Sequence, residues 1–151
     1  MTRMAHATAA GEAEGPALVL SHPLSFWGGI DVETGRIIDH SHPDRGAAVT
    51  GRILVMPGGR GSSSSASVFA ESIRRGTGPA AIVLATADPI LTAGALVADL
   101  LYGTQCPVVM CRIDGIASGD RLRVRSAPGQ ASEVTIVGAG RASRPSERMP
   151  R

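Results

Sequence analysis

Residues 51–85, "GRILVMPGGRGSSSSASVFAESIRRGTGPAAIVLA", decide the fold of this chain. The continuous apolar run at 53–56 is typical of a strand covered on both faces of a parallel sheet. After a glycine-rich turn, apolar residues at helical spacing predict a helix that begins near Ser63 and ends at Gly76: Ala66, Phe69, Ala70 and Ile73. "PAAIVLA", at 79–85, predicts a second buried strand. This order indicates two parallel strands joined by a helix.

The same alternation continues downstream. "ADPILTAGALVADLLYG" (87–103) predicts a helix with Asp88 as its N-cap, Pro89 at its first position and Gly103 at its end. "CPVVMCRI" (106–113) predicts a third strand, and further strands are expected before residue 31 and after a turn at Gly119–Asp120. The fold class is therefore α/β: a small parallel sheet with helices on one side and antiparallel strands on the other.

Length and composition indicate one domain without a nucleic-acid or membrane partner. A chain of 151 residues with 43% hydrophobic residues can bury one core, which we place at 16–137. The segments 1–15 and 138–151 are small, polar or proline-containing, and we expect both to be disordered. A net charge of +2 and 3% aromatics disfavour a nucleic-acid surface. No apolar run has the length of a membrane span or the character of a signal peptide, so a cytoplasmic location is expected.

Neither the cysteines nor the histidines predict a metal site. Cys106 and Cys111 lie five residues apart on a predicted strand, so they point to opposite faces and cannot share a metal or a disulfide. We expect buried, reduced thiols. The loop "DHSHPD" at 39–44 has a metal-like pattern, but a solvated loop of turn-forming residues is the better interpretation. Its candidate ligands are His40, His42, Asp39 and Asp44.

The glycine–serine junction at 57–65 does not match the common phosphate-binding or esterase motifs. A P-loop needs a lysine, and all 15 basic residues here are arginines. The third glycine of a dinucleotide fingerprint is replaced by Ser64, and the esterase elbow G-x-S-x-G is absent. A glycine-rich turn before a helix still directs unpaired N–H groups toward one point, which attracts an anion. Arg60 could bind a carboxylate there, and a serine could act as a base.

A plainer interpretation remains open for single serines, because any one of Ser63, Ser64 or Ser65 could cap the helix. A row of four serines exceeds what capping requires and favours a functional site. Two interpretations also remain open for Phe26 and Trp27, which precede a pair of glycines: both could be core aromatics, or both could line an interface with a partner.

The stretches "PLSFWGGIDVETGRIIDHSHPDRG" (23–46) and 51–103 resemble the small subunit, or swivel domain, of the aconitase X family. The resemblance covers roughly residues 18–110. It implies a swivelling β/β/α domain with a catalytic serine on its glycine–serine loop. The serine that matches is Ser62, which in the family is taken to abstract the proton next to the substrate carboxylate. The surrounding loop residues are then expected to bind substrate: Gly59, Arg60, Gly61, Ser63 and Ser64.

The resemblance also implies a reaction and a partner. Family members resemble either cis-3-hydroxy-L-proline dehydratases or phosphomevalonate dehydratases, and the four serines favour the first. The chain is expected to bind no metal or other cofactor itself and to act only in a heterodimer with an aconitase X large subunit. That subunit is expected to carry an iron or iron–sulfur centre. The alternatives are a phosphomevalonate dehydratase small subunit and a non-catalytic anion-binding or regulatory subunit.

Overall fold

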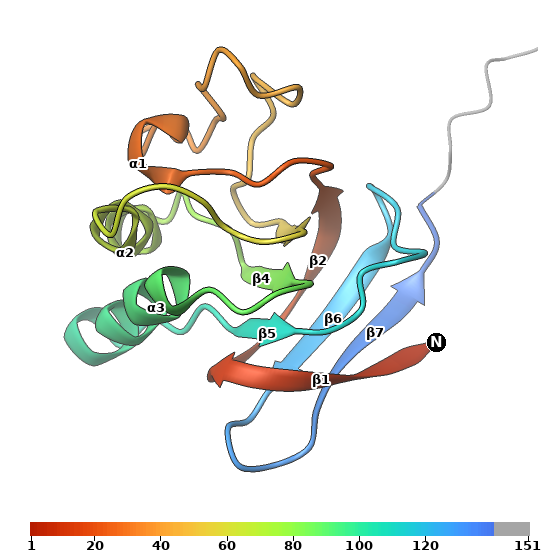
Figure 1. Cartoon of the computed structure of the whole chain (residues 1–151). Coiled ribbons are helices and arrows are strands. Elements are labelled where there is room, and N and C mark those ends of the chain that lie inside the picture. Colours follow the sequence, from red (N-terminus) through yellow and green to blue (C-terminus); the bar gives the residue numbers. More distant parts are fainter. Residues whose placement is uncertain (141–151) are drawn as a thin grey trace, which may run out of the picture.

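The computed structural model describes residues 1–140, in which seven strands close into a barrel and the helices pack on one side (Figure 1). The strands are β1 (Thr2–Ala9), β2 (Gly11–Val19), β3 (Ile53–Met56), β4 (Ala81–Leu84), β5 (Val108–Met110), β6 (Arg121–Ser126) and β7 (Ser132–Gly138). The helices are α1 (Phe26–Gly29), α2 (Ser65–Arg75) and α3 (Pro89–Tyr102).

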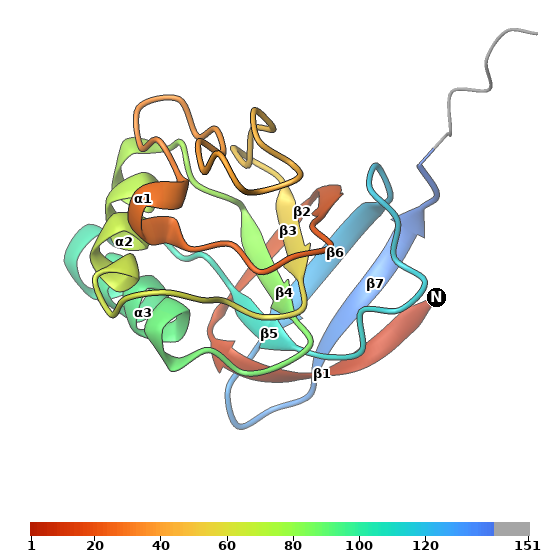
Figure 2. The same ribbon diagram turned by 45° about the horizontal axis from the view of Figure 1, so that its top comes forward.

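Half of the barrel is parallel and half is antiparallel. Strands β2, β3, β4 and β5 pair in parallel in that order, so that Ile53 lies between Ala17 and Ala81. Strands β1, β6 and β7 pair antiparallel and join the two edges of the parallel half. The helices lie together against the parallel half (Figure 2). This β/β/α layering confirms the predicted fold class.

The parallel strands separate two hydrophobic cores. Every residue of β3 and β4 is buried, as their continuous apolar runs predict. Alternate residues of β3 point in opposite directions: Ile53 and Val55 fill the barrel interior, while Leu54 and Met56 face the helices. The interior is completed by the antiparallel half, and the outer core by the helices.

The expectation that residues 1–15 are disordered is wrong. They form β1 and the first part of β2, and β1 closes the barrel by pairing with both β5 and β7. The core-facing positions of β1 are occupied by small residues: Ala5 packs against the barrel interior and Ala9 against the outer core, so the strand carries little hydrophobic signal. For the predicted tail at 138–151, Gly138 ends β7 and the Gly140 N–H donates to an Asp120 carboxylate oxygen at 2.8 Å. Residues 141–151 lie outside the described residues.

Helices α2 and α3 end where the sequence predicts, but their outer faces differ. Both stop at a left-handed glycine, Gly76 for α2 and Gly103 for α3. The outer face of α2 is polar and carries Glu71, which pairs with two arginines of the last turn. The outer face of α3 leaves large apolar side chains in solvent: Leu96, Val97, Leu100, Leu101 and Tyr102. Exposed apolar patches of this kind mark interaction surfaces.

No helix found in residues 1–140 combines the length and apolar character needed to cross a bilayer.

We expect Gly94→Ala to lower the free energy of unfolding by about 1 kcal/mol. A Cβ at Gly94 would lie 2.8 Å from the Ala66 carbonyl oxygen and 2.9 Å from a ring carbon of Phe69, so α3 would be pushed away from α2. Overpacking costs about 1–3 kcal/mol, and the better helix propensity of alanine returns about 1 kcal/mol. Chemical denaturation measures the difference. Ala93→Gln, a change at the exposed neighbouring position of the same helix, is the control and should stay within about 0.5 kcal/mol. A more stable Gly94→Ala variant would contradict the close helix packing.

Candidate active site

The glycine–serine loop leaves the carboxyl end of β3 and runs between two other segments before α2 begins. On one side, a Cβ at Gly59 would collide with the carboxylate of Asp88. On the other side, a Cβ at Gly61 would collide with the Ser25 hydroxyl, and Gly61 has a φ of +100° that favours glycine. The glycines are therefore required by close approach on both sides of the loop.

The segment at 24–27 contacts both the glycine–serine loop and the start of α2. Leu24 and Gly59 form a parallel backbone bridge, and the Trp27 N–H donates to Ser65 Oγ at 3.2 Å. Phe26 is fully buried, with its ring centroid 5.0 Å from that of Phe69 on α2, whereas Trp27 is 59% exposed. The two aromatic residues therefore have different environments: Phe26 is a core residue, and Trp27 is not.

The four serines have different environments. Ser62 Oγ accepts a hydrogen bond from the Ser64 N–H at 3.2 Å, and the Ser62 carbonyl accepts the Ser65 N–H at 2.9 Å. Ser64 occupies the N-cap position, but its side chain makes no capping bond. Helix α2 consequently begins at Ser65, two residues later than expected, and the side chain of Ser62 accepts the N–H of the N-cap residue, Ser64.

Ser62 and Ser63 are exposed, and within residues 1–140 their backbone N–H groups donate to no protein acceptor. Ser65, in contrast, is buried. Free N–H groups beside an exposed hydroxyl at the start of a helix favour negative charge at that point.

Arg60 is an exposed cation beside this point. In the part of the chain that the structure describes, it has no ion-pair partner within 4.0 Å. It faces the loop at 39–44: the pKa of the Asp39 carboxyl lies below its usual range chiefly because the Ser41 hydroxyl and N–H donate to it, and the charge of Arg60 lowers it further. The guanidinium of Arg60 is therefore available to bind a carboxylate.

The loop and the barrel have known counterparts. Residues 3–135 match the family model described as the aconitase X swivel domain. The chain belongs to this family. Its fold agrees with a crystal structure of Thermococcus kodakaraensis aconitase X in its holo-form, with a TM-score of 0.80 and 31% identity, covering 91% of this chain and 98% of that chain.

Relatives of this swivel domain carry two different names. A cis-3-hydroxy-L-proline dehydratase of Pseudomonas aeruginosa is 44% identical over 111 residues, which are 72% of this chain and 19% of that protein. A phosphomevalonate dehydratase small subunit of Pyrococcus horikoshii is 37% identical over 127 residues, which are 84% of this chain and 89% of that subunit. The chain thus spans less than a fifth of the length of the first relative and most of the second.

The swivel domain does not offer a ligand set for an iron or iron–sulfur centre in residues 1–140, where no three His, Cys, Asp or Glu side chains gather. His42 is buried and holds its own loop: its Nδ1 accepts the Asp44 N–H at 3.0 Å, and its Nε2 lies 3.2 Å from the His22 carbonyl oxygen. The two cysteines are free thiols that contact different cores. Cys106 is buried, as predicted, and burial raises its pKa to about 12, whereas Cys111 is only half-buried.

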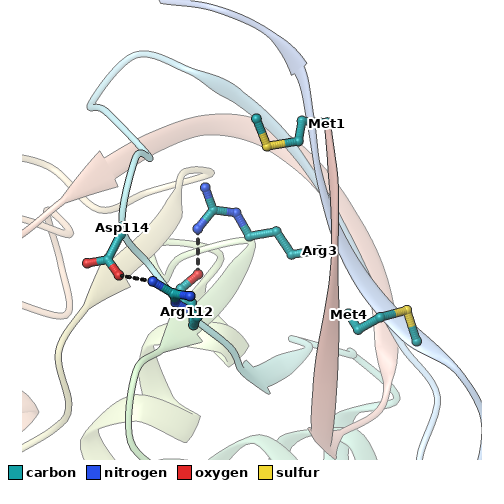
Figure 3. Close-up of a pocket in the computed structure, with 5 residues that line it drawn as sticks. All are labelled: Met1, Arg3, Met4, Arg112 and Asp114. Carbon is teal, nitrogen blue, oxygen red and sulfur yellow. Dashed lines mark hydrogen bonds and ion pairs between the residues drawn. The ribbon is translucent and has the colours of Figure 1, made fainter.

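A separate hollow of about 430 Å³ lies where β1 begins and the chain leaves β5 (Figure 3). Arg3 donates from Nη1 to the Arg112 carbonyl oxygen at 2.7 Å, and Arg112 pairs with Asp114 at 3.4 Å. Methionines 1 and 4 complete the lining, and the glycine–serine loop takes no part in it. Internal partners already engage both guanidinium groups, so this hollow does not compete with the loop as an anion site.

We expect Gly59→Ala to lower the free energy of unfolding by at least about 2 kcal/mol. The new methyl group would displace Asp88, whose Oδ1 accepts the N–H groups of Ile90 and Leu91 at 2.9 and 3.2 Å and caps α3. Loss of a cap costs about 1 kcal/mol, and steric strain adds about 1–3 kcal/mol.

Chemical denaturation of a double-mutant cycle tests the cause. In an Asp88→Gly background the obstruction is gone, so Gly59→Ala should cost much less. If Gly59→Ala lowers the free energy of unfolding equally in both backgrounds, the Asp88 carboxylate is not the reason that position 59 requires glycine.

Proposed function

We propose that this swivel domain is the small subunit of an aconitase X type hydro-lyase, which eliminates water from a hydroxylated carboxylic acid with Ser62 as the proton-abstracting base. The observation that carries the proposal is the position of Ser62 Oγ at the start of α2, where it accepts the Ser64 N–H beside two free N–H groups. A serine hydroxyl is a weak acid, and it becomes a base only where its alkoxide is stabilised. Backbone N–H groups and the charge of Arg60 supply that stabilisation here.

In the proposed reaction, the catalytic groups are divided between this chain and the large subunit. Arg60 binds the substrate carboxylate, and Ser62 removes the proton from the adjacent carbon. The electron pair of the broken C–H bond forms the new C=C bond, the β-C–O bond breaks, and the departing hydroxyl takes up a proton to leave as water. We assign the acid for that last step to the large subunit. We also assign the family's iron or iron–sulfur centre to that subunit, because residues 1–140 provide no ligand set for it.

Two features support a large-subunit partner. Ser62 is exposed in this chain, whereas an alkoxide needs a site from which water is excluded. The apolar outer face of α3, with Leu100 at 86% exposure, is also typical of a subunit surface that another protein covers. Two free cysteines fit a reducing compartment, so we place the complex in the cytoplasm.

For the substrate, we propose cis-3-hydroxy-L-proline. Arg60 is the one cationic residue between Met56 and Ile73, which suits a ligand with a single carboxylate near Ser62. Mevalonate 5-phosphate carries two anionic groups and is the second candidate. The observation that favours it is the length match to the Pyrococcus horikoshii small subunit, of which this chain spans 89%.

We expect Ser62→Ala to lower kcat of the assembled enzyme by about a hundredfold or more, the range for losing a positioned proton-transfer group. Folding and assembly should persist, because the lost bond to the Ser64 N–H is worth about 0.5–1.5 kcal/mol. Steady-state kinetics of the complex provide the measurement. Ser67→Ala, at an exposed position of α2 outside the glycine–serine loop, is the matched control and should retain most of the turnover. If Ser62→Ala raises KM but leaves kcat near normal, Ser62 holds an anion and the chain is a non-catalytic binding subunit.

A second prediction concerns assembly. The purified chain alone should eliminate no water from either candidate substrate, and adding the large subunit should yield a heterodimer that dehydrates cis-3-hydroxy-L-proline. Size-exclusion chromatography at micromolar concentration and an assay of both substrates test this. Turnover by the chain alone would refute the divided site, and turnover of mevalonate 5-phosphate alone would reverse the substrate assignment.

A further inference from the structure

Trp27 combines a fixed backbone with an exposed side chain. Its N–H donates to Ser65 Oγ at 3.2 Å, and its carbonyl oxygen accepts the Ser25 hydroxyl at 3.0 Å. Both serines are buried, so two buried hydroxyls are engaged in holding this one residue. The indole nevertheless remains 59% exposed and contributes little to the core. A large aromatic side chain held in this way at the surface is available to a ligand or a partner.

The two serines that hold Trp27 also flank the proposed base. Ser25 lies directly against Gly61, the residue before Ser62, and Ser65 is the first residue of α2. Figures 1 and 2 both place α1, which contains Trp27, beside the start of α2. The neighbouring Phe26 anchors this arrangement through its contact with Phe69. Trp27 is thereby fixed at the rim of the glycine–serine loop.

We propose that Trp27 is a specificity-determining residue whose indole binds the ring ammonium group of a cyclic amino acid. An indole face attracts a cation, and the attraction strengthens when the site excludes water. In cis-3-hydroxy-L-proline, the carbon that loses its proton is bonded to both the carboxylate and the ammonium nitrogen. With Arg60 at the carboxylate and Trp27 at the ammonium group, both charged neighbours of that carbon are recognised beside Ser62. This inference rests on the proposed function; mevalonate 5-phosphate has no cation for the indole to bind.

The experiment uses two unreactive ligands of nearly the same shape. L-Proline carries the ring ammonium group, and tetrahydrofuran-2-carboxylate has an ether oxygen in its place. Their dissociation constants are measured by calorimetry on the complex of this chain with its large subunit. We expect the wild-type complex to bind L-proline at least about tenfold more tightly than the ether. Trp27→Leu should abolish most of this preference without weakening the ether, while Trp27→Phe should retain part of it.

The chain also offers a control variant and a fluorescence measurement for this experiment. Tyr102→Leu replaces another exposed aromatic side chain, at the end of α3, and should leave the preference unchanged. Trp27 is the only tryptophan of the chain, so a Trp27→Phe complex provides the blank for a fluorescence titration with L-proline. A change of emission that is absent from the blank would support contact between the ligand and the indole.

Two results would overturn the assignment of Trp27 while leaving the proposed function intact. The first is a complex that dehydrates cis-3-hydroxy-L-proline and in which Trp27→Leu keeps the full preference for L-proline. The second is a Trp27→Leu chain that assembles only weakly with the large subunit, while the assembled fraction keeps this preference; Trp27 would then be an interface residue. A wild-type complex that does not dehydrate cis-3-hydroxy-L-proline would instead refute the proposed substrate.

Discussion

The contact between Gly59 and Asp88 couples the glycine–serine loop to the rest of the fold. The backbone at Gly59 passes so close to the Asp88 carboxylate that no side chain fits between them. The other oxygen of the same carboxylate caps α3. One side chain therefore fixes both where α3 begins and where the loop after β3 can run. Because β3 and β4 are adjacent parallel strands, their carboxyl ends bring these two loops together.

Closure of the barrel leaves the carboxyl ends of β3 and β4 available for a functional site. The antiparallel strands β1, β6 and β7 satisfy the outer edges of the parallel strands, so no sheet edge in residues 1–140 is open to pairing with another chain. The helices cover the outer face of the parallel half, and the barrel interior is filled by side chains. The carboxyl ends of β3 and β4, with the loops that follow them, are then the natural place for a ligand. Under the proposed function, the large subunit has to approach the loops at these strand ends.

The sequence predicts best where patterns are strong and local. The buried runs of β3 and β4, the ends of α2 and α3 and the glycine-rich turn between β3 and α2 all follow from residue type and spacing. Strand β1 could not be found in this way, because alanines occupy its core-facing positions and its pairing partners lie 99 or more residues away. Local patterns likewise could not reveal that Ser65 binds the backbone of Trp27, 38 positions away, or that Phe26 is buried by packing on Phe69 while Trp27 is not.

Three serines of the row, Ser62, Ser64 and Ser65, have different environments although they lie within one turn of chain. Ser65 is buried and holds Trp27, so its hydroxyl is not available to a substrate. Ser64 occupies the cap position without using its side chain. Ser62 alone among these three has an exposed hydroxyl, and its oxygen accepts the N–H of the residue just before α2, an arrangement that favours negative charge on that oxygen. That stabilisation stays weak while water surrounds the oxygen and strengthens when water is excluded. Under the proposed function, the basicity of Ser62 is therefore a property of the assembled enzyme, to which this chain would contribute the geometry and the large subunit the enclosure.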